Sequence, residues 1–165
     1  MAKQDAFTGE EWTLLRLAPS LVAGGTAAAD PSGLLSSIKE SFAGAKGMAG
    51  AHKANSGLEL FTALAADRSI PAMPDPKTLL GEGSREQQMQ NLKSAVLERI
   101  RSAVALVASK ATPAEAVEYR EMLVSVAEQA ADASKEGGFL GFGGVRVSDK
   151  EKAFIAEVKA AAGIA

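Results

Sequence analysis

Few residues of this sequence have the types and spacing that catalysis or metal binding requires. The 165 residues include no cysteine and one histidine, His52, which excludes disulfides, thiolate metal sites and thiol catalysis. His52 lies among Lys and Ala residues, and we interpret it as an exposed polar side chain. Ferritin-like di-iron sites need a Glu-x-x-His motif on two helices, and the sequence contains neither copy.

Three carboxylates follow one another at four-residue spacing. Glu128, Asp132 and Glu136 would therefore share one face of a helix. Because Ca²⁺ and Mg²⁺ take oxygen ligands, a cation site completed by acids of a neighbouring helix is one interpretation. A solvent-exposed face, partly neutralised by Lys135, is the other interpretation, and the sequence favours it.

The segment Gly137–Gly144 has the sequence GGFLGFGG. It is as rich in glycine as a phosphate-binding loop, but it lacks the neighbouring elements and the terminal motif of such a loop. A dinucleotide fingerprint follows a strand, and a P-loop ends in Gly-Lys-Ser/Thr, whereas these glycines follow a predicted helix. The large apolar residues Phe139, Leu140 and Phe142 predict either a plug over helix ends or an exposed patch that enters a partner or a membrane interface. The plug is favoured narrowly; if exposed, these three residues are the candidate interaction site.

The elements around these residues are predicted to be helices. One helix is predicted to begin at Asp30, with Pro31 in its first turn, and another is predicted to begin at Asn55 or Ser56. Pro19 is predicted to kink or break the first helix. Capping boxes, in which Ser or Thr precedes Glu or Gln by three residues, mark four other helix starts: Thr8–Glu11, Ser84–Gln87, Thr112–Glu115 and Ser148–Glu151.

Apolar residues recur at three- and four-residue spacing, and nothing beyond the short run 145–147 alternates with period two. The sequence therefore predicts an all-α fold: one helical domain over residues 1–165, a compact bundle of about six helices. The Pro-rich segment 69–83 is predicted to be an internal linker. Ala-Ala-Asp ends two apolar segments, at 28–30 and 130–132, which suggests a pseudo-twofold helix–loop–helix repeat.

Composition limits the partners and the location. The net charge of −2 and the pI near 5.5 argue against nucleic acid, whose binding requires a basic face. The sequence contains no run of about 18 apolar residues, the length that a transmembrane helix needs. Its first residues do not resemble a signal peptide. Zero cysteines fit a reducing compartment, so we expect a cytoplasmic protein. The segment Gly33–Lys46 has two interpretations: an amphipathic helix that contacts a membrane surface, or a buried helix of the bundle. The buried helix explains its spacing of apolar residues better.

Two segments resemble the TerB-like (tellurite-resistance) helical proteins. Their pattern is an Ala-rich helix ending in Ala-Asp-Gly, then a Ser-x-x-Glu cap and a helix closing with Leu-Gly. Residues 28–30 are similar to the first part and 147–163 to the second, although Pro follows Asp30. The resemblance implies a non-enzymatic cytoplasmic helical module tied to stress response or to envelope-associated complexes. It also implies that acids near the turns are possible cation ligands; by position these are Asp30, Glu40 and Glu151.

The sequence thus predicts a non-catalytic helical protein-interaction module of unknown partner, able to form a homo-oligomer and without a cofactor. One alternative is a peripheral membrane or apolar-ligand binding protein that uses Gly137–Gly144. The other is a carboxylate-based metal-binding stress protein of TerB-like type. A substrate site built from Glu, Arg and Tyr would leave no motif, so a catalytic role stays open but is not favoured.

Overall fold

The computed structural model describes residues 3–29, 57–136 and 147–164. Within these ranges the chain is helical and contains no strand, which confirms the all-α prediction. The elements are a 3-10 turn, η1 (Lys3–Ala6), and six α-helices: α1 (Gly9–Ala29), α3 (Glu59–Ala66), α4 (Pro76–Leu80), α5 (Arg85–Lys110), α6 (Pro113–Glu136) and α7 (Asp149–Ala162). The loops of both halves of the suggested repeat lie outside these ranges, so the repeat stays a prediction.

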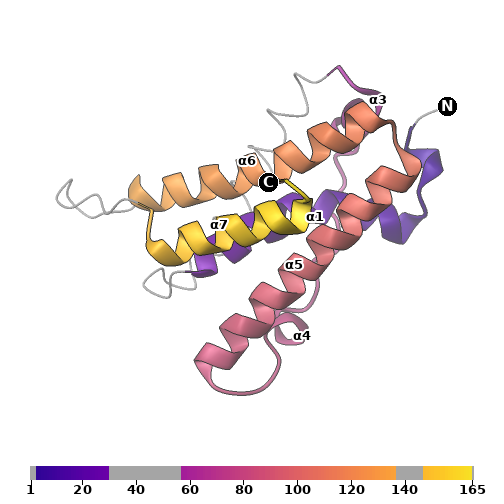
Figure 1. The fold of residues 1–165 in the computed structure, drawn as a ribbon. Coiled ribbons are helices and arrows are strands. Elements are labelled where there is room, and N and C mark those ends of the chain that lie inside the picture. The colour runs from indigo at the N-terminus through magenta and orange to yellow at the C-terminus, as the bar shows by residue number, and fades with distance from the viewer. Residues whose placement is uncertain (1–2, 30–56, 137–146, 165) are drawn as a thin grey trace.

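Helix α1 is the centre of the bundle (Figure 1). It packs against α5, α6 and α7, and α7 also packs against α5 and α6. From residue 17 to 26 every residue of α1 is buried except Ser20, which is half-buried. A helix that is apolar around its whole circumference is stable only inside a protein, and the other three long helices supply that cover. The N-terminal end of α5 projects from the bundle together with α4 (Figure 1).

Of the predicted kink or break at Pro19, the break is wrong, because α1 continues through this residue to Ala29; the kink stays a prediction. A proline has no N–H, so the carbonyl of Leu15, four residues earlier, loses its helical partner. The buried Tyr119 of α6 donates its hydroxyl to Leu15 O at 2.8 Å. A donor from a distant part of the chain thus satisfies the carbonyl that the proline leaves free. Burial also raises the pKa of Tyr119, so this hydroxyl keeps its proton.

All four predicted capping sites begin helices, and three of them form the complete reciprocal box. Thr8 N donates to Glu11 Oε2 at 2.7 Å, and Glu11 N donates to Thr8 Oγ1 at 3.3 Å. The reciprocal bonds of a capping box are also present at Thr112–Glu115 and Ser148–Glu151. At Ser84 the hydroxyl accepts from Gln87 N.

The start predicted for the third helix is wrong. Its N-cap is Leu58, which offers no side-chain cap, and not Asn55 or Ser56. The buried Glu115 supplies the missing acceptor: Leu60 N donates to Glu115 Oε1 at 2.8 Å. The other oxygen of this carboxylate serves the N-terminus of α6. One acid therefore caps two helices.

The segment predicted as a linker contains a helix. Asp75 caps α4 by accepting from Lys77 N at 2.9 Å, and α4 packs on α5. The residues between α3 and α4 are fastened to α1 by Arg16, which donates to the backbone oxygens of Asp67 and Ser69. The linker therefore forms part of the bundle surface.

Candidate functional site

Most of the residues predicted from sequence to form a site lie outside the described ranges: Asp30, Glu40, Phe139, Leu140 and Phe142. Glu151 is described, and it is buried as a helix cap that accepts from Ser148 N at 2.8 Å. Among the described residues no group of three or more His, Asp or Glu side chains is placed to hold a metal ion. The cation ligands that the resemblance implies stay a prediction.

The acidic stripe on α6 fits the exposed-face interpretation where it is described. Glu128 Oε1 pairs with Lys159 Nζ at 2.9 Å, and about half of the Glu128 side chain is exposed. Asp132 is also exposed. Glu128 therefore joins α6 to α7 instead of facing an enclosed site.

A cavity of about 550 Å³ is lined by the C-terminal end of α1 and the N-terminal turns of α5 and α7. This volume falls within the range of about 300–1,000 Å³ that is usual for small-molecule sites. Its small and apolar lining comprises Gly25, Ala28, Ala29, Met89, Leu92, Ala153 and Phe154. Its polar lining comprises Arg85, Glu86, Gln90, Lys93 and Lys150.

Small residues of α1 leave the space for this cavity. A Cβ atom on Gly25 would lie 2.8 Å from Cζ of the buried Phe154, closer than unbonded carbon atoms approach. Gly25 therefore lets the aromatic ring lie directly against the backbone of α1. Ala28 and Ala29 follow on the same wall, and with Met89 they make an apolar surface.

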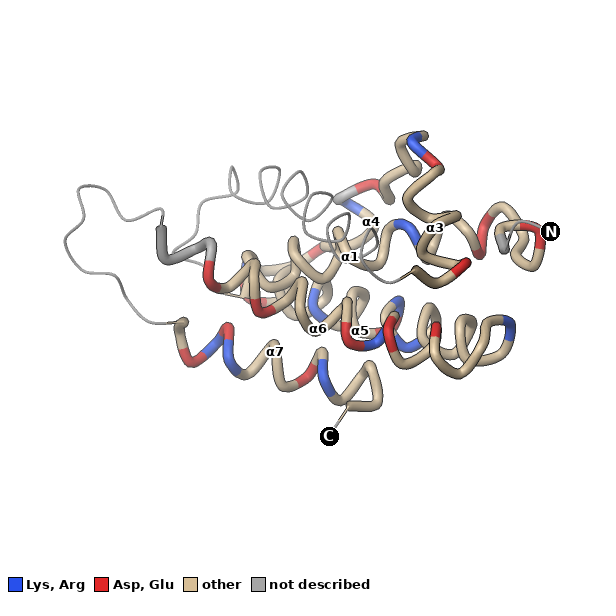
Figure 2. The backbone as a smooth tube through the Cα atoms, turned by 90° about the horizontal axis from the view of Figure 1, so that it is seen from above, with Lys and Arg blue, Asp and Glu red and all other residues tan. Residues whose placement is uncertain are grey.

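Charges of both signs border the apolar wall. Among the described lining residues, Arg85, Lys93 and Lys150 are cations and Glu86 is an acid. Lys93 Nζ pairs with Glu157 Oε1 at 2.7 Å, with 32% of the Lys93 side chain and 40% of the Glu157 side chain exposed. Both signs of charge are also dispersed along the other described helices (Figure 2).

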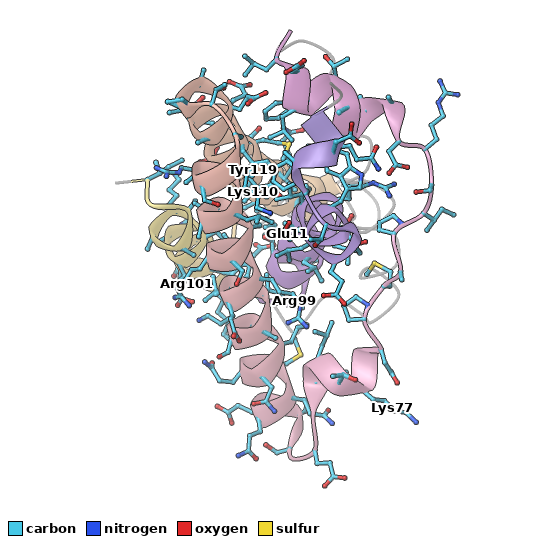
Figure 3. All side chains as sticks on the ribbon, turned by 90° about the vertical axis from the view of Figure 1, so that its right-hand side faces the viewer. Glu11, Lys77, Arg99, Arg101, Lys110 and Tyr119 are labelled. Carbon is cyan, nitrogen blue, oxygen red and sulfur yellow. The ribbon has the colours of Figure 1, made fainter. Side chains whose placement is uncertain are left out.

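The residues at the other end of the bundle have structural roles. Lys110 Nζ pairs with Glu11 Oε2 at 2.6 Å, and its hydrogen bond lowers the pKa of Glu11. Figure 3 shows these two side chains pointing toward one another between α1 and α5. Arg99 and Arg101 point to different sides of α5 (Figure 3) and do not form one basic patch.

A polar cluster joins α1 to the chain after α3. Asp67 accepts from Ser69 Oγ at 2.6 Å and from Trp12 Nε1 at 2.9 Å, and it pairs with Arg16 at 3.1 Å. The bonds from Ser69 and Trp12 lower the pKa of Asp67 to about 2. Ser69 Oγ accepts from Arg16 and donates to Asp67, so it links these two side chains. The cluster is therefore a clasp between α1 and the chain after α3.

No protein-family model matches the chain, and no curated protein or solved structure matches it at a significant level. The TerB-like resemblance accordingly stays a prediction. None of the described helices is both long and apolar enough to span a bilayer.

Sequence reasoning missed the cavity because its lining comes from three separated segments, 25–29, 85–93 and 150–154. No local pattern marks it, because acids accompany the cations in the first turns of α5 and α7: Glu86 beside Arg85, and Asp149 and Glu151 beside Lys150.

Proposed function

We propose that the protein is a non-catalytic binding protein that holds a small apolar molecule in the cavity between α1, α5 and α7. The observation that carries this proposal is the cavity itself, about 550 Å³ in volume with a wall of small and apolar side chains. Filling such a wall with an apolar ligand contributes free energy in proportion to the area removed from water.

The lining favours binding over catalysis. Its described residues include no Ser, Thr, Tyr or His, the side chains that most often act as nucleophile or general base. The titratable groups among these described residues are three cations and Glu86, and they lie at the rim. Groups in that position can orient a ligand whose body lies on the apolar wall.

A small molecule is also better supported than a protein partner. The exposed large apolar side chains of the described residues are Ile70, Met73 and Val117. They lie on two different segments, and scattered exposure of this kind is ordinary for a soluble protein. A role in protein contacts or self-association still depends on Phe139, Leu140 and Phe142, and it stays a prediction. The cysteine-free composition supports action in the cytoplasm.

A neutral apolar fluorophore, N-phenylnaphthylamine, tests the proposal. We expect its emission to rise and to saturate at one molecule per chain. Straight-chain alcohols should displace it, and each added CH₂ that is buried should strengthen binding by about 0.8 kcal/mol, roughly fourfold. The gain should stop when the chain fills the cavity. Binding without saturation, or without dependence on chain length, would contradict a defined cavity.

A matched pair of variants places the ligand. Ala153 is exposed on α7 and lines the cavity, whereas Ala156 is exposed on the same helix and does not. Ala153→Trp should occupy the mouth and weaken fluorophore binding by about tenfold or more, a free-energy loss of about 1.4 kcal/mol. Ala156→Trp should bind as the parent does. Equal affinity in the two variants, with equal melting temperatures, would locate the ligand elsewhere.

A further inference from the structure

We propose that residues 68–75, the proline strap, are a recognition segment for a partner domain that binds polyproline II strands in an aromatic-lined groove, as SH3 domains do. The strap has the sequence Arg-Ser-Ile-Pro-Ala-Met-Pro-Asp. It connects α3 to α4 and lines no part of the cavity. The inference is therefore independent of the proposed function and adds an interaction surface to it.

The spacing of apolar residues and prolines carries the first step. Ile70 directly precedes Pro71. Three residues later, Met73 directly precedes Pro74. A polyproline II strand has about three residues per turn, so residues three apart lie along the same edge of it. Two prolines separated by two residues are the pattern that aromatic-lined grooves of this class bind.

The backbone of the strap suits this conformation. Proline fixes its own φ at about −65°, and the residue before a proline is restricted to extended conformations. These two rules cover every residue from 70 to 74 except Ala72. Asp75, which precedes Pro76, has φ −57° and ψ 125°, close to the polyproline II values of about −75° and 145°. Residues 70–75 form no helix, strand or turn.

The exposure of the strap repeats with the same period of three. The two prolines of the pattern are half-buried, whereas Ile70 is 84% exposed and Met73 is 46% exposed. Ala72 and Asp75 are exposed too. Figure 3 shows the chain that leads to α4, where Lys77 is labelled, on the outer side of the molecule. Exposed apolar side chains are ordinary by themselves; their regular order along a proline-rich strand is what indicates a partner.

The bundle fixes both ends of the strap. At its start, Arg16 donates to the backbone oxygens of Asp67 and Ser69. At its end, Asp75 caps α4, whose buried Leu79 belongs to the hydrophobic core. A segment that is already extended and held in place loses little conformational entropy when it binds. The clasp therefore prepares the strap for a partner.

Arg68 indicates the charge of the partner groove. This residue is exposed at the start of the pattern, two residues before Ile70. The adjacent acid, Asp67, is already paired with Arg16 at 3.1 Å. A guanidinium forms its strongest hydrogen bonds with a carboxylate, which it can bind through two N–H groups. The partner that fits the strap thus has acids at one end of its aromatic-lined groove.

A titration of the full chain, labelled with ¹⁵N, tests the proposal by NMR of its backbone amides. The probes are purified SH3 domains that have acidic residues beside the groove. We expect saturable one-to-one binding that shifts the amides of Ser69, Ile70 and Met73 and leaves the amide of Phe154, in the cavity wall, unchanged. If no such domain shifts the strap amides, the inference is wrong, and the proposed function of the cavity stands.

Two matched pairs of variants assign the contact to side chains of the strap. Ile70→Ser should weaken binding by about tenfold or more, whereas Val117→Ser, at a large apolar residue exposed on α6, should bind as the parent does. Arg68→Gln should weaken binding several-fold, and Arg101→Gln, at an exposed arginine of α5, should not. All four side chains are exposed, so the variants should keep the parental melting temperature. Equal affinity of the four variants would overturn the inference.

A capped peptide of residues 67–76 compares the free segment with the strap in the folded protein. We expect the full chain to bind the same SH3 domain more tightly than the peptide does, because its strap is already held in place. Tighter binding of the peptide would mean that the bundle hides the edge that carries the prolines. The strap would then be a structural connection, and the inference would be overturned.

Discussion

Tyr119 and Pro19 form a pair that only the fold brings together. Pro19 removes the donor that Leu15 O would use in a regular helix, and the Tyr119 hydroxyl, on α6, replaces that donor at 2.8 Å. Both groups are buried, where an unpaired carbonyl costs about 1–3 kcal/mol. The central helix can therefore contain a proline without breaking.

A double-mutant cycle measures this pair. Tyr119→Phe removes the hydroxyl, keeps the ring, and should lower the free energy of unfolding by about 1–3 kcal/mol, because Leu15 O is left without a donor. In the Pro19→Ala background the new N–H of residue 19 reaches Leu15 O, so the same substitution should cost less. Urea denaturation of the four proteins gives the coupling energy. Equal costs in both backgrounds would show that the two residues act independently.

At the scale of elements, the clasp between α1 and the chain after α3 holds the long connection against the bundle. Arg16 and Trp12 on α1 both contact Asp67, and Ser69 completes the cluster. Trp12 is the single tryptophan of the chain, and its indole N–H is part of this contact. Tryptophan fluorescence therefore reports directly on whether the clasp is closed.

We expect acid to weaken the clasp. The pKa of Asp67 falls from 3.8 to about 2 in the folded protein, so folding favours the ionised carboxylate. Its contribution to stability is complete above about pH 4 and is lost as the pH falls through about 2. Asp67→Asn should remove this dependence, so the difference in unfolding free energy between parent and variant should shrink below about pH 4.

Urea unfolding followed by Trp12 fluorescence at several pH values checks this expectation. Ser69→Ala removes the hydroxyl that lowers the pKa of Asp67 most, so it should leave an intermediate pH dependence. A difference between parent and Asp67→Asn that stays constant down to about pH 2 would mean that Asp67 does not titrate as described.

The sequence predicted elements well where the signal is local. Thr8, Thr112 and Ser148 each cap a helix through a glutamate three residues later, and that pattern is visible within four residues of chain. The start of α3 was mispredicted because its acceptor, Glu115, lies 55 residues away. Interactions between distant residues leave no periodic pattern in a single sequence.

At the scale of the whole molecule, the candidate site was less predictable than the fold because it depends on tertiary packing. The cavity exists because small residues at the end of α1 meet the first turns of α5 and α7, and this meeting depends on how α5 and α7 pack around α1. The close approach of Gly25 to Phe154 depends on the tertiary structure and leaves no local pattern in the sequence.

Ligand binding should also appear in the stability of the whole chain. A ligand that binds only the folded state stabilises it by about 2.7 kcal/mol at roughly one hundred times its Kd, which for a protein of this size raises Tm by about 5–10 °C. We expect a neutral straight-chain alcohol, dodecanol, to raise Tm by this amount, as measured by scanning calorimetry. Ala153→Trp should show a much smaller shift, because its cavity mouth is occupied.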